Sequence, residues 1–247
     1  MSYKIWVISD THLAIGVPAK NMNVFGPLWE GYMEKMAANW RRLIGGDDLV
    51  LIPGDISWGM TLKEAEADLL WIDSLPGTKV ILRGNHDYWW SSASKISTIM
   101  PPTVRFIHNN AFHWHDIAIG GTRLWDTDEY NFNAYVHFQE NTRARKEREE
   151  RDDAKIFQRE LERLRLSLKQ LDPQAKVRIA MTHYPPISAD LLPSMTAKIL
   201  EEFNIHICVF GHLHNLKKDK PMFGEVRGVR YLLTSCDYLD FTPIRIL

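Results

Sequence analysis

The sequence predicts an α/β fold, and three observations support this prediction. Short apolar runs that suit buried strands alternate, along the N-terminal half, with longer segments of helical periodicity. Each of these predicted strands ends in a carboxylate, an amide or an imidazole, which is how open α/β sheets build sites at their edges. The chain has 247 residues, of which 45% are hydrophobic and 25% charged, so it has enough apolar material for a sizeable core.

Charge and cysteine content narrow the class of protein. The net charge is −1 and the sequence pI about 6.8, so no overall basic field favours nucleic acid or an anionic membrane as partner. No apolar run approaches the roughly 18 to 20 residues of a membrane span, and the N-terminus shows no signal pattern. Cys208 and Cys236 each lie in an apolar run, which predicts buried reduced thiols. We expect a cytoplasmic protein of one domain, residues 1–247, while its oligomeric state stays open.

Three predicted strands of the N-terminal half lead directly into polar side chains. An Asp or a Gly-Asn-His-Asp turn has ordinary structural roles when it occurs alone, such as capping a helix or closing a turn. The repetition of the pattern favours a site instead. The strands are Lys4–Ile8 before Asp10 and His12, Leu49–Ile52 before Asp55, and Val80–Leu82 before Asn85, His86 and Asp87.

Helical segments separate these strands. Apolar spacing predicts helices over about 29–43, 61–75 and 91–100, each ended by glycine or proline. Thr61 and Glu64 have the spacing of a capping box at the start of the second helix.

The C-terminal half begins at Val104 with shorter strands joined by tight turns, which predicts a more antiparallel arrangement. Two of its strands again end in imidazoles, 177–181 before His183 and 205–210 before His212 and His214. The tail segments 230–235 and 241–246 are expected to complete a second sheet.

A charge-rich insertion is predicted over about 141–172. Its apolar residues recur every three or four positions, which indicates one helix with a single buried stripe. Because acidic and basic residues alternate on it, a solvated face with ion pairs is favoured over a nucleic-acid groove. The stripe consists of Phe157, Leu161, Leu164, Leu168 and Leu171.

The strand ends together supply a set of metal ligands. Carboxylates, imidazoles and a neutral amide oxygen suit Mn²⁺, Fe or Zn²⁺ rather than Ca²⁺. The set is too large for one ion with an open position and about right for two, with Asp55 on the central strand as the carboxylate that bridges them. The candidate ligands are Asp10, His12, Asp55, Asn85, His183, His212 and His214.

At this point the chain resembles a known family, the calcineurin-like metallophosphoesterases. Their ordered blocks are Asp-x-His, Gly-Asp, Gly-Asn-His-Asp/Glu, a lone His and Gly-His-x-His, and the resemblance spans residues 4 to 214. The helical stretch 160–164 resembles a branch of bacterial predicted phosphohydrolases. The blocks stand here as Asp10-Thr-His12, Gly54-Asp55, Gly84-Asn85-His86-Asp87, His183 and Gly211-His212-Leu-His214.

The resemblance implies a four-layer α-β-β-α sandwich, in which two mixed β-sheets are flanked by helices. It also implies two divalent metal ions that share a bridging hydroxide, which attacks a phosphoester. One ion would bind Asp10, His12, Asp55 and His214, and the other Asp55, Asn85, His183 and His212.

Residues beside the ligands receive expected roles. His86 is not needed as a ligand, so it is free to protonate the leaving oxygen or stabilise charge on the phosphate. Asp87 either orients His86 or stabilises its own turn. Arg83 either contacts the phosphate or is a surface arginine at the end of a strand.

One departure from the family affects the choice of substrate. In Ser/Thr protein phosphatases the Gly-Asp block continues with a second Asp three residues on, where this chain has Trp58. Trp58, Tyr88 and Trp89 instead place aromatic rings on two of the site loops, where they would stack on a base or an aryl group. Packing in the core is the competing interpretation for these rings.

The sequence therefore predicts a metal-dependent phosphohydrolase that acts on a small phosphoester, such as a phosphodiester or a nucleotide. A nuclease or a Ser/Thr protein phosphatase using the same site is the alternative. A non-catalytic scaffold is a third hypothesis, disfavoured because every ligand position is filled.

Overall fold

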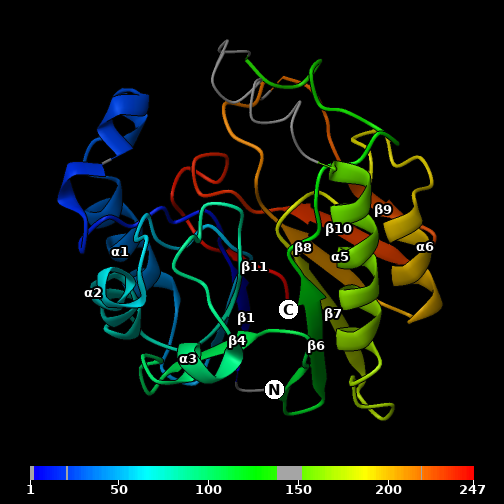
Figure 1. The fold of residues 1–247 in the computed structure, drawn as a ribbon, viewed down its shortest axis with the longest axis horizontal. Helices are drawn as coiled ribbons and strands as arrows, with labels where there is room; N and C mark the ends of the chain where they lie inside the picture. Colours follow the sequence, from blue (N-terminus) through cyan, green and yellow to red (C-terminus); the bar gives the residue numbers. More distant parts are fainter. Residues whose placement is uncertain (1–2, 21, 138–151, 218) are drawn as a thin grey trace.

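The computed structural model describes residues 3–20, 22–137, 152–217 and 219–247. Within these ranges, two β-sheets face each other and helices cover both outer sides (Figure 1). The first sheet has five strands in the order β11-β1-β2-β3-β4, with β1 to β4 parallel and β11 antiparallel to β1. These strands are β1 Ile5–Val7, β2 Leu49–Ile52, β3 Thr78–Leu82, β4 Val104–Ile107 and β11 Ile244–Arg245.

The second sheet has six strands in the order β5-β6-β7-β8-β10-β9 among the described residues. Its inner pairs are parallel, and only the edge strands β5 and β9 run antiparallel to their neighbours. The strands are β5 Phe112–Trp114, β6 Ile117–Thr122, β7 Val177–Thr182, β8 Ile207–Phe210, β9 Gly224–Val226 and β10 Val229–Leu233.

Among the residues that the structure describes, three helices pack on the outer face of the first sheet and two on that of the second (Figure 1). The predicted capping box is confirmed, because Thr61 Oγ1 accepts from the Glu64 amide and the Glu64 carboxylate accepts from the Thr61 amide. The helices are α1 Tyr32–Leu43, α2 Leu62–Asp73, α3 Ala93–Ser97, α5 Asp153–Leu168 and α6 Met195–Glu202, and short 3₁₀ turns occupy Pro18–Lys20, Met22–Phe25 and Pro27–Trp29.

Alternation along the strands divides the core into three apolar layers. In β1, Ile5 and Val7 point between the sheets, whereas Trp6 points toward the helices of the first sheet. Neighbouring side chains of a strand lie on opposite faces, so both faces of each sheet are apolar and both are covered. The result is the four-layer α-β-β-α sandwich that the sequence resemblance implied.

Two predictions about the sheets are wrong. The segment from Val104 is not mainly antiparallel: β4 joins the first sheet parallel to β3, and β6 runs parallel to β7. The connection from β6 to β7 passes through α5, which supplies the length that a parallel crossover needs. The tail also divides, because β10 joins the second sheet whereas β11 returns to the first. The strand β9 was not expected, and α3 is shorter than the predicted 91–100.

The predicted apolar stripe of the insertion is confirmed. Phe157, Leu161, Leu164 and Leu168 lie on the buried face of α5, and Leu171 is buried just after its end. Residues 141–151 lie outside the described ranges. Glu160 shares the buried face, where its carboxylate accepts from Thr122 Oγ1 at 2.7 Å and pairs with Arg163 at 2.6 Å. Cys208 and Cys236 are both buried and unpaired, as predicted. Among the described residues, none of the helices combines the length and hydrophobicity that crossing a membrane requires.

Asp48 fixes the start of the first sheet. Its carboxylate accepts from the Lys4 amide at 2.8 Å, the Trp6 indole at 3.0 Å and the Gly45 amide at 2.9 Å. Burial raises the pKa of Asp48, but these hydrogen bonds outweigh burial and lower it below its usual value.

We predict that Asp48→Ala lowers the free energy of unfolding by about 2–4 kcal/mol, because it leaves buried donors without partners. Urea denaturation measures the effect, and Asp47→Ala, at an exposed neighbour, is the matched control. Since the folded pKa is depressed, the stabilising effect is complete above the ordinary carboxyl pKa and is lost as pH falls through the folded pKa. Equal midpoints for the two variants near neutral pH would contradict this role.

Candidate metal centre

The candidate ligands come from the carboxyl ends of five strands. Asp10 and His12 follow β1, Asp55 follows β2 and Asn85 follows β3, all in the first sheet. The second sheet contributes its histidines after β7 and β8. Parallel neighbours end at the same edge of a sheet, so the loops of both sheets meet at one end of the sandwich.

A first group of ligand atoms is formed by Asp10, His12 and His214, all within 4.8 Å of one another. His214 Nε2 lies 3.4 Å from Asp10 Oδ1 and 3.3 Å from His12 Nε2. Asp55 approaches this group, with its Oδ2 at 3.8 Å from His12 Nε2.

A second group surrounds the Asn85 amide oxygen. His183 Nε2 lies 2.7 Å and His212 Nδ1 2.9 Å from Asn85 Oδ1. The same Asp55 Oδ2 that faces His12 lies 3.4 Å from His183 Nε2. Asp10, Asp55 and His183 also offer atoms within 4.8 Å of one another, so the two groups adjoin at the two aspartates.

The chemistry of these donors fits a cation. His183 Nδ1 lies 3.0 Å from the Pro53 carbonyl oxygen, which can only accept, so Nδ1 carries a proton. Its Nε2 then faces Asn85 Oδ1 and Asp55 Oδ2, and a lone pair there would repel both oxygens. The position needs a positive charge, supplied either by a second proton or by a metal ion.

Electrostatics lead to the same conclusion. Burial disfavours the charged form of His183, but the Asp55 carboxylate outweighs burial and raises the pKa of His183 to about 9. Burial lowers the pKa of His12 to about 4 and that of His212 to about 3, which keeps both rings neutral with a lone pair available. Burial opposes the ionised form of Asp10, yet hydrogen bonding to His214 and its charge lower the pKa of Asp10 to about 2.

Four candidate ligands have left-handed backbones, with φ of 57° at Asp10, 44° at His12, 51° at Asp55 and 72° at His212. For residues other than glycine, sparsely populated conformations of this kind cost of order 1–3 kcal/mol each and persist where the surroundings enforce them. Such strain clusters at functional sites, and here it aims side chains from tight loops at a common point.

Glycines next to the ligands permit this convergence. A Cβ on Gly84 would lie 2.0 Å from Asp55 Oδ1, and one on Gly211 would lie 2.0 Å from Asp10 Oδ2. Gly54 has a φ of 91°, and a Cβ on it would lie 2.6 Å from His183 Nδ1. Glycine recurs in the motifs because the ligand of another loop occupies the space of its side chain.

His86 borders both groups without belonging to either. Its ring centroid lies 5.7 Å from that of His12 and 4.7 Å from that of Trp58. Its Nδ1 is buried and has no hydrogen-bond partner among the described residues, and burial lowers the pKa of His86. A neutral imidazole with an unused nitrogen therefore lies beside His12 of the first group.

The Asp87 carboxylate joins two loops of the site. It accepts from the amides of Ile56 at 2.9 Å, Ser57 at 3.1 Å and Gly84 at 2.7 Å, and from the Trp89 indole at 3.0 Å. These donors place Asp87 at the base of the loops that carry Asp55 and His86. Burial, followed by the charge of Asp55, raises the pKa of Asp87 to about 6.

The four residues predicted to contact substrate differ in their exposure and in their distance from the candidate ligands. Trp58 stacks on His12 with centroids 5.1 Å apart, and Tyr88 is 53% exposed with its ring 6.2 Å from that of His86. Trp89 is only 2% exposed and packs in the core beside Asp87. Arg83 is half-buried, its Nε has no partner among the described residues, and burial lowers its pKa.

Asp237 is a residue that the sequence analysis missed. Its Oδ1 lies 2.9 Å from His214 Nδ1, and its Oδ2 accepts from the Asn215 amide at 3.2 Å. A carboxylate at this position keeps the proton on His214 Nδ1 and fixes the ring orientation, so that Nε2 has a free lone pair on the side of Asp10 and His12. One signal in the sequence could have indicated Asp237: it comes just after the predicted strand 230–235, which pairs in the structure, as β10, with the strand before His212.

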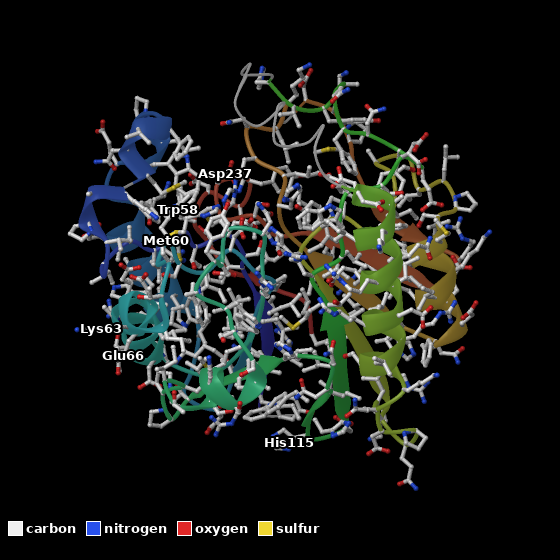
Figure 2. All side chains as sticks on the ribbon, in the orientation of Figure 1. Trp58, Met60, Lys63, Glu66, His115 and Asp237 are labelled. Carbon is white, nitrogen blue, oxygen red and sulfur yellow. The ribbon has the colours of Figure 1, made fainter. Side chains whose placement is uncertain are left out.

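Figure 2 shows where the site lies in the molecule. Asp237 and Trp58 are labelled toward its upper end, while His115 lies at the lower edge.

Comparison with known proteins places this site in context. The model of the family described as calcineurin-like phosphoesterase matches residues 3–216. Among curated proteins, the gene 66 protein of Mycobacterium phage D29 is 34% identical over 83 residues, and that of phage L5 is 37% identical over 82. These matches take in 34% and 33% of this chain, and they span only 40% and 39% of the two phage proteins.

Among solved structures, the phosphopantetheinyl hydrolase of Mycobacterium tuberculosis matches with a TM-score of 0.56 and 16% identity. The match covers 99% of this chain and 96% of the other. At this identity the likeness concerns the fold, and it extends over the whole four-layer sandwich.

We predict that Gly84→Ala abolishes tight binding of divalent metal, because the new methyl group would displace the Asp55 carboxylate. Metal per chain, measured by elemental analysis after Mn²⁺ loading and desalting, checks this outcome. Gly46→Ala is the control, since a Cβ at Gly46 meets no atom within 4 Å. Full metal content in a folded Gly84→Ala protein would refute the inferred close approach of the two loops.

We also predict that Asp237→Ala weakens metal binding by about 10- to 100-fold, because His214 loses the partner that orients its ring. Metal titration followed by calorimetry measures the affinity. Asp240→Ala is the matched control, as its exposed carboxylate pairs with Lys35 rather than with a histidine. An affinity equal to that of the control would exclude the orienting role.

Proposed function

Because the chain belongs to the calcineurin-like phosphoesterase family, we propose that it hydrolyses a small phosphoester at a centre of two divalent metal ions. The proposal comprises metal-dependent hydrolysis of a phosphoric ester, the number and kind of ions, the roles of individual residues and the size of the substrate.

The observation that carries the proposal is the position of Asp55. One oxygen of its carboxylate faces His12 at 3.8 Å and His183 at 3.4 Å, so it can serve both ligand groups. A shared carboxylate is what a pair of closely spaced ions requires. One ion would be held by Asp10, His12, Asp55 and His214, and the other by Asp55, Asn85, His183 and His212.

Nitrogen and oxygen donors of this kind favour Mn²⁺, Fe or Zn²⁺. When bound, such ions lower the pKa of water to near neutrality and polarise phosphoryl oxygens. The chain itself contributes a fixed arrangement of ligands, because buried hydrogen bonds hold each loop.

We assign the proton-donor role to His86. Its neutral ring carries one N–H, and it stands beside the ligands without taking part in either group. From there it can protonate the leaving oxygen or stabilise charge on the phosphate. Asp87 would act as a positioning residue that locks the loop of His86 to that of Asp55. Tyr88 and Trp58 border the same side, and Arg83 lies one residue before the glycine of this turn.

Several features favour a small substrate, such as a phosphodiester or a nucleotide, over a macromolecule. Trp58 stands where Ser/Thr protein phosphatases have the second aspartate, and it covers His12 and His86. The near-neutral net charge gives no steering toward a polyanion. The unpaired thiols of Cys208 and Cys236 fit a reducing cytoplasm as the compartment.

We predict that the protein, stripped with a chelator and reloaded with Mn²⁺, hydrolyses bis-p-nitrophenyl phosphate or p-nitrophenyl phosphate. His86→Ala is expected to lower kcat by about 10²- to 10⁴-fold at unchanged metal content, as loss of a proton donor should. His115→Ala, an exposed histidine stacked on Tyr3 at the far end of the molecule, is the control.

Preference for the diester or the monoester decides between the two substrate types. Equal turnover by His86→Ala and His115→Ala would reject the role of His86. Absence of metal-dependent turnover of both esters would reject a general small-ester hydrolase.

A further inference from the structure

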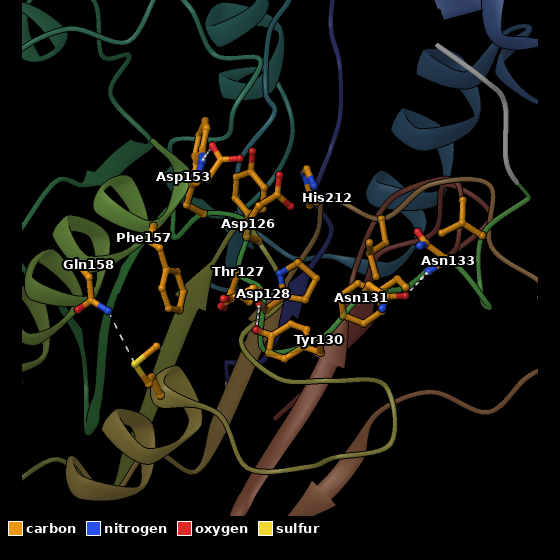
Figure 3. A pocket seen from close by; sticks show the side chains of 18 residues that line it. Asp126, Thr127, Asp128, Tyr130, Asn131, Asn133, Asp153, Phe157, Gln158 and His212 are labelled. Atoms are coloured by element: carbon orange, nitrogen blue, oxygen red, sulfur yellow. Dashed lines mark hydrogen bonds between the residues drawn. The ribbon is translucent and has the colours of Figure 1, made fainter. Parts of the chain in front are cut away.

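A cavity of about 580 Å³ opens beside the candidate metal centre, on the side of the second sheet. Its walls come mainly from the connection after β6, residues 125–136, and from the start of α5. Figure 3 shows His212 and Asp126 at one end of the cavity and Phe157 and Gln158, from α5, along another wall. The cavity thus begins at a candidate metal ligand and leads away from it.

Tyr184 joins the cavity to the ligand groups. Its ring centroid lies 4.0 Å from that of His212 and 5.1 Å from that of Trp125. His212, Tyr184 and Trp125 therefore form a continuous aromatic wall from the site into the cavity. A group that entered along this wall would remain in contact with rings from the first ligand onward.

The lining is predominantly aromatic and apolar. Rings and carboxylates are the main side chains that face the space, and its described lining holds neither lysine nor arginine. Such a lining binds an organic group through its apolar surface. The residues that decide this chemistry are Trp125, Tyr130, Phe132, Phe157 and Tyr184.

Hydrogen bonds hold the walls in place. The Trp125 indole donates to Asp153 Oδ1 at 2.7 Å, which ties the connection to the first turn of α5. The Tyr130 hydroxyl donates to the Pro185 carbonyl oxygen at 2.9 Å, and its ring lies 5.7 Å from that of Phe132. The volume falls within the range of ligand pockets, and these contacts give the cavity a formed shape.

We propose that this cavity binds the organic group of the substrate, and that this group is a bulky aromatic or aliphatic one. The assignment rests on the proposed hydrolysis at the adjoining centre. Hydrolysis breaks the P–O bond to this group and adds water, so that the organic group is left in the cavity as its alcohol. Phosphate from a monoester, or a phosphomonoester from a diester, is left at the ligand groups.

The test compares β-naphthyl phosphate with phenyl phosphate, because the second ring adds apolar surface to a leaving group of similar acidity. The wild-type protein is expected to favour the naphthyl ester by about tenfold in kcat/KM. Ala154→Trp fills the cavity from an exposed position in α5 and should remove the preference, as should Phe132→Ala, which removes one wall. Ala93→Trp, an exposed alanine in the first turn of α3, is the matched control and should keep it.

A binding measurement separates this assignment from the proposed hydrolysis. The Mn²⁺-loaded protein is titrated in a calorimeter with (2-naphthyl)methylphosphonate and benzylphosphonate, in which a CH₂ group replaces the ester oxygen and links the ring to phosphorus through a bond that is not hydrolysed. Tighter binding of the naphthyl compound, lost in Ala154→Trp, supports the cavity assignment even if no ester turns over.

Three outcomes would overturn the assignment. They are hydrolysis of both esters with no preference, a preference that survives Ala154→Trp and Phe132→Ala, and a preference that Ala93→Trp removes equally well.

Discussion

The contact on which the site depends is the approach of the Asp55 carboxylate to imidazoles from both halves of the molecule. Asp55 follows β2, the central strand of the first sheet, so its loop lies between those of β1 and β3. The loop after β7 brings His183 from the opposite sheet to within 3.4 Å of the same oxygen. One buried carboxylate thereby links the loops of the two sheets at the end where their strands stop.

This arrangement lowers the stability of the fold, but it holds the candidate ligands ready to bind metal ions. Buried carboxylates and imidazoles are stable together only while positive charge balances the aspartates, and four residues of the site also have left-handed backbones. The apolar layers on both faces of each sheet supply the stability that allows this. The strained loops can therefore keep their side chains aimed at one point before any ligand arrives.

The features predicted correctly from the sequence are those that depend on neighbouring residues along the chain. Strand ends with Asp, Asn and His are visible along the chain, and the structure brings those side chains within a few ångströms of one another. Sheet pairing was mispredicted after Val104, because a short apolar strand does not reveal whether its partner is parallel. Asp237 escaped notice because its role depends on β10 lying beside β8, a pairing between distant segments. The position of residues 125–130 after a strand suited a loop over the site, but the shape of the cavity could not be predicted, since its walls combine the connection after β6 with α5 and Tyr184.

The two sheets contribute unequally to the site. The first supplies the shared aspartate and His86, so the groups that would act on the phosphoryl centre belong to rigid, short loops. The second supplies His183 and His212, but the connection 125–136 that shapes the cavity carries no candidate ligand. Residues such as Phe132 can therefore change without disturbing Asp55 or its partners. This separation would let the walls beyond His212 change, and with them the organic group accepted, without moving the loops that carry the candidate ligands.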